Sequence, residues 1–394
     1  MRYLLIRNTR LANLPPDQKP TSVLLCDDRI VGIGANLQHP LIDTDTIDAN
    51  GLYTLPAIVD ICKPQPERFT PDLCKSLNFE NITAGVTSIM TLSKDIEENI
   101  ANLQMANCKL LNYAYHFPLR QVTEANQRRF RHLMITHGIA TAMLRFGDDA
   151  NADVANLQHN IDVARALNLM VLYDFRSLPD PLDRLVHLQT LADLLRENPT
   201  NRAFILGVET ERELQVICDL RKTVDAKAQL CLNPFDPPTP DVPRLSHDQI
   251  ADTLRNARWS SLGLGFSASR AVKEGWPDTA LEIVSRNRLS LINSLAASRP
   301  LTPAELAEFV IERPAEFVGL RNPMANVAEG MSANLILWNA DFHDEATIAP
   351  PESEPVHLKF SGHIDYVIMN GQLVMGERLI PKRICGTSLY ARLV

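Results

Sequence analysis

The chain has 394 residues, of which 45% are hydrophobic and 22% are charged, and this composition is typical of globular proteins, not of disordered or membrane proteins. Its length exceeds that of a usual single core, so one large domain with a smaller one is expected. The net charge of −8, without any block rich in Lys or Arg, argues against nucleic acid or an anionic membrane as a partner.

The sequence predicts a cytoplasmic protein. The apolar run in residues 1–7 is too short for a signal peptide, and no stretch approaches the roughly 18 uninterrupted apolar residues of a transmembrane helix. Seven cysteines, an odd number without any C-x-x-C, favour reduced thiols over a disulfide framework or structural zinc. Only Cys62 stands at a position with a functional argument, and a small buried apolar role is the simpler interpretation for it.

Residues 1–54 contain short apolar runs separated by turns. The runs at residues 3–7, 23–26 and 29–33 have the length of strands, and Asp27-Asp28 between the last two is a hairpin signal. No helical period appears, so a small β-domain is predicted here.

From residue 55 to about residue 321, apolar strands alternate with helical segments. Strands are predicted at residues 86–92, 141–146, 169–173, 203–208, 228–232 and 261–266, and helices at residues 160–167, 185–196 and 211–223. The glycines of the last strand would let another backbone come close. This alternation over about 265 residues has the size and rhythm of a (β/α)8 TIM barrel.

Another helix is predicted to begin after Thr302, a candidate N-cap, with Pro303 at the first helical position and Glu305 completing a capping box. A further helix is predicted from residue 311.

β-character then returns. Strands are predicted at residues 334–338 and 364–369, with a Pro- and acid-rich loop at residues 350–355 between them, and Asn370-Gly371 is a hairpin turn into a strand at residues 372–375. Because the first segment is too small to bury a core alone, both chain ends are expected to form one composite β-sandwich. The predicted domains are residues 1–54 and 327–394 for the sandwich and residues 55–326 for the barrel.

Four segments carry a family pattern. They are residues 47–64 (IDANGLYTLPAIVDICKP), the F-x-D-D turn at residues 146–149, residues 312–320 (ERPAEFVGL) and residues 329–338 (EGMSANLILW). Together they resemble the dihydroorotases of the amidohydrolase superfamily, whose first barrel strand carries IDA-x-G-x-x-x-P-G-x-x-D-x-H-x-H. The resemblance runs through nearly the whole chain and implies an α/β fold with an amidohydrolase-type TIM barrel.

The resemblance also implies a zinc site of histidines and carboxylates, with a catalytic aspartate on the last strand. At the aligned positions this chain has Cys62 and Pro64 for the first two histidines, Pro66 for an arginine, Leu92 for an asparagine, Asp174 and Gly207 for the later histidines, and Ser267 for the aspartate. Only Asp149 keeps a ligand type, which is too little for catalytic zinc even with Cys62 and Asp174. The expectation is a pseudoenzyme without catalytic residues, metal or other cofactor.

Other motifs are weak. None of the ten histidines forms an H-x-H or H-x-x-x-H pair, and His132 and His137, the closest two, are expected at the surface of a helix. Asp148-Asp149 could act as an acid/base dyad, although solvated turn residues are the simpler interpretation. The cluster at residues 128–132 (RRFRH) is expected to be a solvated or interface face and not an anion site.

These observations leave three hypotheses. In the first, the resemblance to the dihydroorotase-like subunits of bacterial aspartate transcarbamoylase implies a structural subunit in pyrimidine biosynthesis, held in a dodecamer with the catalytic transcarbamoylase chain. Self-association of this chain is left open. In the second, the chain is a metal-dependent amidohydrolase, a dihydroorotase or related cyclic amidase, with a site rebuilt from Asp149, Cys62, Asp174 and Asp60. In the third, the barrel mouth binds a small-molecule signal.

Overall fold

The structure is a computed structural model, and it describes residues 2–15, 17–35, 37, 45–64, 78–92, 111–137, 139–147, 154–178, 180–231, 244–263, 283–295, 300–320, 326–348 and 355–376. Within these ranges no helix is long and apolar enough to cross a membrane.

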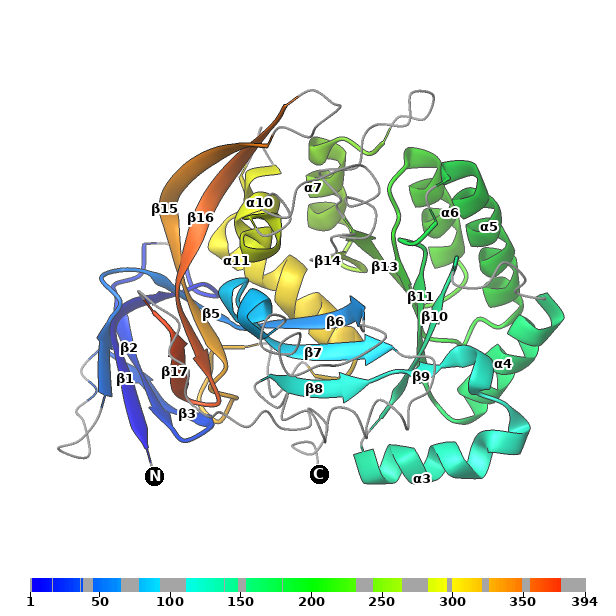
Figure 1. The fold of residues 1–394 in the computed structure, drawn as a ribbon, viewed down its shortest axis with the longest axis horizontal. Coiled ribbons are helices and arrows are strands. Elements are labelled where there is room, and N and C mark those ends of the chain that lie inside the picture. Colours follow the sequence, from blue (N-terminus) through cyan, green and yellow to red (C-terminus); the bar gives the residue numbers. More distant parts are fainter. Residues whose placement is uncertain are drawn as a thin grey trace.

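Both ends of the chain contribute to one eight-stranded sheet (Figure 1). Its strands are β1 (Tyr3–Leu11), β2 (Thr21–Cys26), β3 (Arg29–Gly34), β4 (Asp45–Asp48), β5 (Tyr53–Pro56), β15 (Leu335–Ile348), β16 (Val356–Met369) and β17 (Gln372–Met375). Their order is β17-β16-β15-β5-β1-β2-β3, with β4 beside β1. The antiparallel pairing of β5 with β15 sets Leu55 opposite Ile336 and joins the two ends. They also share an apolar core, which includes Leu25, Leu335 and Ile368.

The middle of the chain forms parallel strands. These are β6 (Ile58–Pro64), β7 (Val86–Leu92), β8 (Asn112–Tyr115), β9 (Phe117–Pro118), β10 (Thr141–Arg145), β11 (Met170–Asp174), β12 (Ala203–Leu206), β13 (Ala226–Cys231) and β14 (Ser260–Gly263). They pair in the orders β6-β7-β8 and β9-β10-β11-β12-β13-β14, and every pairing is parallel. Only His116 separates β8 from β9, so the two sheets follow one another directly. Every residue of β11 and β12 is buried, as expected for strands covered on both faces.

Helices lie outside these strands (Figure 1). They are α3 (Gln127–His137), α4 (Val154–Ala166), α5 (Pro181–Glu197), α6 (Glu211–Arg221), α7 (His247–Asn256) and α10 (Arg288–Leu295), with short 3-10 turns η1 (Leu119–Gln121) and η2 (Glu124–Asn126) before α3. Helix α5 begins four residues before the predicted start at residue 185. The Asp180 side chain caps it by accepting a 2.8 Å hydrogen bond from Leu182 N, and Pro181 takes the first helical position.

The last helical segment is one continuous run of α11 (Pro303–Leu306), the π-turn η3 (Ala307–Glu312) and α12 (Arg313–Phe317). The predicted capping box of Thr302 and Glu305 is confirmed. The separate helix predicted from residue 311 is not found, because the chain stays helical through Pro314. A proline inside a helix disrupts the bonding of the preceding turn, and the π-turn directly before α12 accommodates this disruption.

The predicted strands at residues 86–92 and 372–375 are confirmed with their bounds. The strands predicted at residues 334–338 and 364–369 are the inner ends of much longer strands, β15 and β16, of 14 residues each. Of the loop predicted between them, residues 350–354 lie outside the described residues.

Candidate functional site

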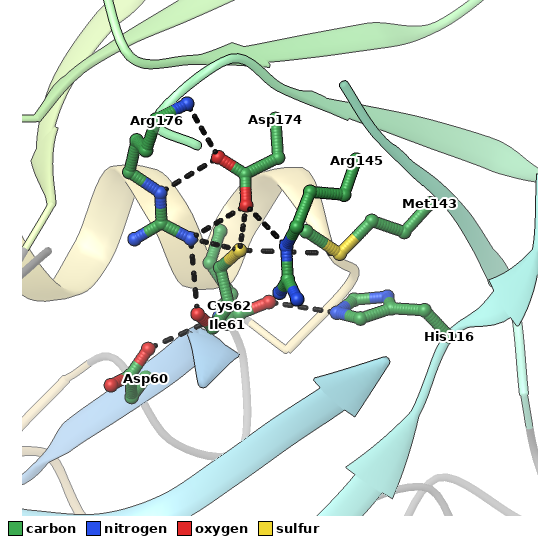
Figure 2. A network of polar contacts seen from close by, with 8 residues as sticks. All are labelled: Asp60, Ile61, Cys62, His116, Met143, Arg145, Asp174 and Arg176. Atoms are coloured by element: carbon green, nitrogen blue, oxygen red, sulfur yellow. Dashed lines mark hydrogen bonds and ion pairs between the residues drawn. The ribbon is translucent and has the colours of Figure 1, made fainter. Parts of the chain in front are cut away.

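A cluster of charged side chains lies where the barrel strands end (Figure 2). Arg145 is the last residue of β10 and Asp174 is the last residue of β11, and the two are paired in register. Two residues earlier on each strand, and so on the same face, stand Met143 and Leu172, which belong to a buried apolar cluster with Phe204. The charged cluster therefore covers one end of the apolar interior.

Asp174 is the centre of this cluster and is only 1% exposed. Its Oδ1 accepts hydrogen bonds from Arg176 Nε at 2.8 Å and from the Arg176 backbone N at 3.1 Å. Its Oδ2 accepts from Arg176 Nη2 at 3.0 Å, from Arg145 Nε at 3.2 Å and from Cys62 Sγ at 3.5 Å. Both carboxylate oxygens are thus engaged by the protein's own donors, most of them charged.

The electrostatics favour ionised Asp174. Burial alone would raise the pKa of this carboxyl, but the charge and hydrogen bonds of Arg176, together with the charge of Arg145, outweigh burial and hold the pKa well below its usual range. The carboxylate therefore stays charged throughout the physiological range.

Cys62, a residue of β6, is buried and lies beside Asp174 of β11. Arg176 Nη2 contacts Cys62 Sγ and donates a 3.1 Å hydrogen bond to the Cys62 carbonyl oxygen. Burial raises the pKa of the thiol well above its ordinary value, although the charge of Arg176 opposes the rise. The Cys62 side chain is therefore a neutral thiol that fills space between strands, which suits a packing role better than that of a nucleophile.

Asp60 joins the edge of the cluster from the same strand. Its Oδ1 accepts a 3.1 Å hydrogen bond from the backbone N of Cys62, and its Oδ2 lies 3.6 Å from Arg288 Nη1 of α10. The carboxylate thus ties β6 to α10.

His116 is buried between β8 and β9, with both ring nitrogens engaged. Its Nε2 lies 2.7 Å from the carbonyl oxygen of Ile61, and its Nδ1 lies 2.7 Å from Thr141 Oγ1. The carbonyl can only accept, so Nε2 carries the proton and Nδ1 accepts from the hydroxyl. Burial lowers the pKa of His116 to about 4, and the ring is neutral at pH 7.

The missing side chain of Gly207 leaves room for Arg176. A Cβ atom on Gly207 would lie 2.8 Å from the backbone N of Arg176 and 3.0 Å from its Cγ, and the φ of +87° favours glycine. The position that the resemblance assigns to a histidine therefore has no room for a side chain while Arg176 stays where it is.

The structure brings together three of the four residues considered for a rebuilt site, namely Cys62, Asp174 and Asp60. The fourth, Asp149, lies outside the described residues, as do Asp148, Pro66 and Ser267. Pro64 ends β6 and Leu92 ends β7. His132 is exposed on α3, as expected.

The two arginines of the cluster, Arg145 and Arg176, were not singled out from the sequence. For Arg145 the available signal was a charged residue at the end of an apolar strand. For Arg176 it was the spacing of two residues from Asp174, which puts both side chains on one face of an extended chain. The close neighbour of Gly263 also differs from the expectation, because it is the side chain of Gln229 and not another backbone.

The described residues of the cluster do not fit a metal ion. No group of three His, Cys, Asp or Glu side chains among them is placed to hold one. Guanidinium groups engage both oxygens of Asp174, and both nitrogens of His116 are occupied. A metal cation at this position would be repelled by the positive charges of Arg145 and Arg176, which cannot act as its ligands.

The comparisons with known proteins identify the fold. A D-hydantoinase (dihydropyrimidinase) from Thermus sp. is similar with a TM-score of 0.79 and 14% identity, over 98% of each chain. A dihydropyrimidinase from Brevibacillus agri has a TM-score of 0.74 and 16% identity over 96% of each chain. An L-hydantoinase from Arthrobacter aurescens has a TM-score of 0.73 and 15% identity, over 97% of this chain and 98% of that one. No family model and no curated protein matches the sequence.

These similarities correct the prediction of a pseudoenzyme. The structures matched over nearly the whole chain are named as hydantoinases and dihydropyrimidinases, which are enzymes. The prediction rests on lost metal ligands whose positions come from short motifs. The matched structures share only 14–16% of their residues with this chain, and at such low identity short motifs do not fix the alignment of single positions. The predicted fold class is confirmed: the chain has an α/β fold of the amidohydrolase type, like that of the hydantoinases it matches, with a parallel-stranded barrel and a β-sheet domain built from both chain ends.

Proposed function

We propose that this chain is a subunit of an aspartate transcarbamoylase assembly in pyrimidine biosynthesis, where its barrel binds the catalytic transcarbamoylase chain. The fold supports the proposal because dihydroorotases, which the four sequence segments resemble, belong to the same superfamily as the matched structures. The proposal concerns assembly and sets no limit on a reaction at the barrel.

The resemblance of the four sequence segments to dihydroorotases carries the proposal. The structure adds a network of Arg145, Asp174 and Arg176. It links β10 and β11 to Cys62 on β6 by charged hydrogen bonds between 2.8 and 3.2 Å. The pairing is largely buried, so water screens it little. Hydrogen bonds of this kind hold the ends of the three strands together, and strand ends that are ordered before binding lose less conformational freedom when the chain joins an assembly.

Co-expression with the catalytic chain of aspartate transcarbamoylase tests this proposal. The expected result is a single complex that contains both chains in equal number, at the mass of a dodecamer, in size-exclusion chromatography with light scattering. Elution of this chain alone, with the transcarbamoylase as a separate peak, would overturn it.

A second candidate function is hydrolysis of cyclic amides, and the similarity to hydantoinases and dihydropyrimidinases over nearly the whole chain favours it. Within the cluster itself, Arg145, Arg176 and Arg288 pair with only two carboxylates, Asp60 and Asp174. This excess of one positive charge would favour a substrate that carries a carboxylate. Since the described residues do not fit a metal, a metal-dependent site would need residues outside them.

Turnover assays separate this second function from the first. Purified protein is incubated with hydantoin, dihydrouracil and dihydroorotate, with and without added zinc, and its metal content is measured by mass spectrometry. Hydrolysis that rises with bound metal would support the amidohydrolase function, and no turnover of the three compounds under either condition would count against it.

A further inference from the structure

Helix α3 concentrates positive charge on an acidic protein. Its eleven residues (QRRFRHLMITH) include three arginines and no Asp or Glu, whereas the whole chain has a net charge of −8. In Figure 1 the helix lies along the lower edge of the barrel with no other labelled helix beneath it.

One face of α3 packs on the protein and the other faces solvent. Phe130 and Leu133 are buried, and the ring of Phe130 lies 4.7 Å from that of Phe117. The opposite face carries Arg128, Arg131, His132 and Ile135, which are spaced i, i+3, i+4 and i+7 and therefore lie on one side of the helix. All four are exposed. We call these four residues the α3 face.

The α3 face is unusual in two respects. Ile135 is 83% exposed, more than any other large hydrophobic side chain that the structure describes. In addition, no described carboxylate forms an ion pair with Arg128 or Arg131, whereas on the neighbouring helices Arg165 pairs with Asp162 and Arg196 pairs with Asp193. A partner that covers the isoleucine and supplies carboxylates to arginines that no described carboxylate pairs with would stabilise this face.

The positive charges and the exposed isoleucine of the α3 face determine which kind of partner can bind it. A second copy that met the face isologously would set arginines against arginines, which is repulsive. Nucleic acid would use the charges but has no apolar pocket for Ile135. A protein that presents carboxylates around an apolar pocket satisfies both the charges and the isoleucine.

We infer that the α3 face docks this chain on an acidic surface of its partner subunit, with Ile135 inserted at the centre and Arg128 and Arg131 paired with carboxylates around it. The identity of the partner, the catalytic transcarbamoylase chain, rests on the proposed function. The interface residues are an inference from the structure of this chain.

A pair of charge-reversed variants tests the inference. R128E/R131E changes the α3 face, and R212E/R258E changes two other exposed arginines, on α6 and two residues after the end of α7, with the same effect on net charge. Affinity for the transcarbamoylase chain is measured by biolayer interferometry. R128E/R131E should weaken binding by at least about tenfold, because each like-charge contact is costly, while R212E/R258E should bind as the wild type does. Wild-type binding should also weaken between 0.05 and 0.5 M salt, as expected for exposed charges.

A third variant, I135D, should weaken binding as well, and urea unfolding of all variants should match the wild type because the altered side chains are exposed. Unchanged affinity of both R128E/R131E and I135D would overturn the inference and leave the proposed assembly standing. Failure of the wild type itself to bind would overturn the proposed assembly and this docking site with it. Self-association or nucleic-acid binding of the wild type that R128E/R131E abolishes would assign the face to another occupant and also overturn the inference.

Discussion

Gly207 and Arg176 occupy mutually dependent positions at the end of the barrel. The ideal Cβ position of Gly207 lies 2.8 Å from the backbone N of Arg176, closer than real Cβ atoms approach other atoms. Arg176 in turn supplies four of the hydrogen bonds that hold Asp174 and Cys62. The absence of a side chain at residue 207 is therefore a condition for the whole charged cluster.

Gly207→Ala should destabilise the protein more than Gly51→Ala. Both glycines have a left-handed φ, +87° and +89°, but a Cβ on Gly51 would meet no atom within 4 Å. Left-handed strain costs about 1–2 kcal/mol at either position, and the steric clash with Arg176 adds about 1–3 kcal/mol at Gly207 only. Urea unfolding measures both. Equal losses in the two variants would mean that Arg176 moves aside freely.

Asp174→Asn should cost about 3–5 kcal/mol, because it leaves the largely buried guanidinium groups of Arg145 and Arg176 without their charged partner. The matched control is Asp193→Asn, which breaks a pair with Arg196 on the surface, where the Asp193 side chain is 74% exposed. That change should cost less than about 1 kcal/mol. Similar free energies of unfolding for the two variants would show that the barrel-end cluster contributes no more than a surface ion pair.

Local signals in the sequence were sufficient where the interaction itself is local. Thr302, Pro303 and Glu305 lie within four residues of one another, and their capping box was predicted fully. The Asp180-Pro181 start of α5 has the same local character, whereas the apolar period alone predicts a start at residue 185. Strands β15 and β16 are longer than predicted for a related reason. The outer half of β15 (FHDEATI) is mostly polar and that of β16 (VHLKFS) alternates apolar and polar residues, so neither has a continuous apolar run.

The candidate site could be predicted only in part. Cys62 and Asp174 were singled out by the family pattern, and the structure places them 3.5 Å apart, Sγ to Oδ2. The contact of Arg145 with Asp174 depends on the register between β10 and β11, and periodicity along one strand gives no register with its neighbour. The fit of Arg176 against Gly207 depends on backbone positions that no residue pattern reports.

Cys62 should resist alkylation in the native protein. Its thiol is buried and its pKa is raised by that burial, so both access and thiolate formation are unfavourable. Cys26 and Cys218 are half-exposed and serve as internal references. Iodoacetamide labelling followed by peptide mass spectrometry should modify these two before Cys62, which should react only when urea unfolds the chain. Labelling of Cys62 at the rate of Cys26 would contradict the buried placement.

Stability should fall between about pH 6.5 and pH 4 because of His116. Burial lowers the pKa of this histidine to about 4 in the folded protein, while the unfolded chain keeps a value near 6.5. Below pH 6.5 the unfolded chain therefore binds a proton that the folded protein does not, and the free energy of unfolding decreases as the pH falls. The total effect is about 3 kcal/mol. Asp174 acts in a lower window, since a carboxyl whose pKa is depressed on folding loses its contribution only below about pH 4.

Urea unfolding of wild type, His116→Gln and His247→Gln at pH 7 and pH 5 isolates the His116 contribution. His247 is the matched control, because burial also lowers its pKa but its side chain is more accessible at the start of α7. His116→Gln is expected to be less stable than the wild type at pH 7, since it disturbs the contacts with Ile61 and Thr141, yet to lose less stability on going to pH 5. His247→Gln should keep most of the wild-type pH dependence. If His116→Gln and the wild type lose the same free energy between the two pH values, the neutral buried imidazole does not determine the acid sensitivity of this fold.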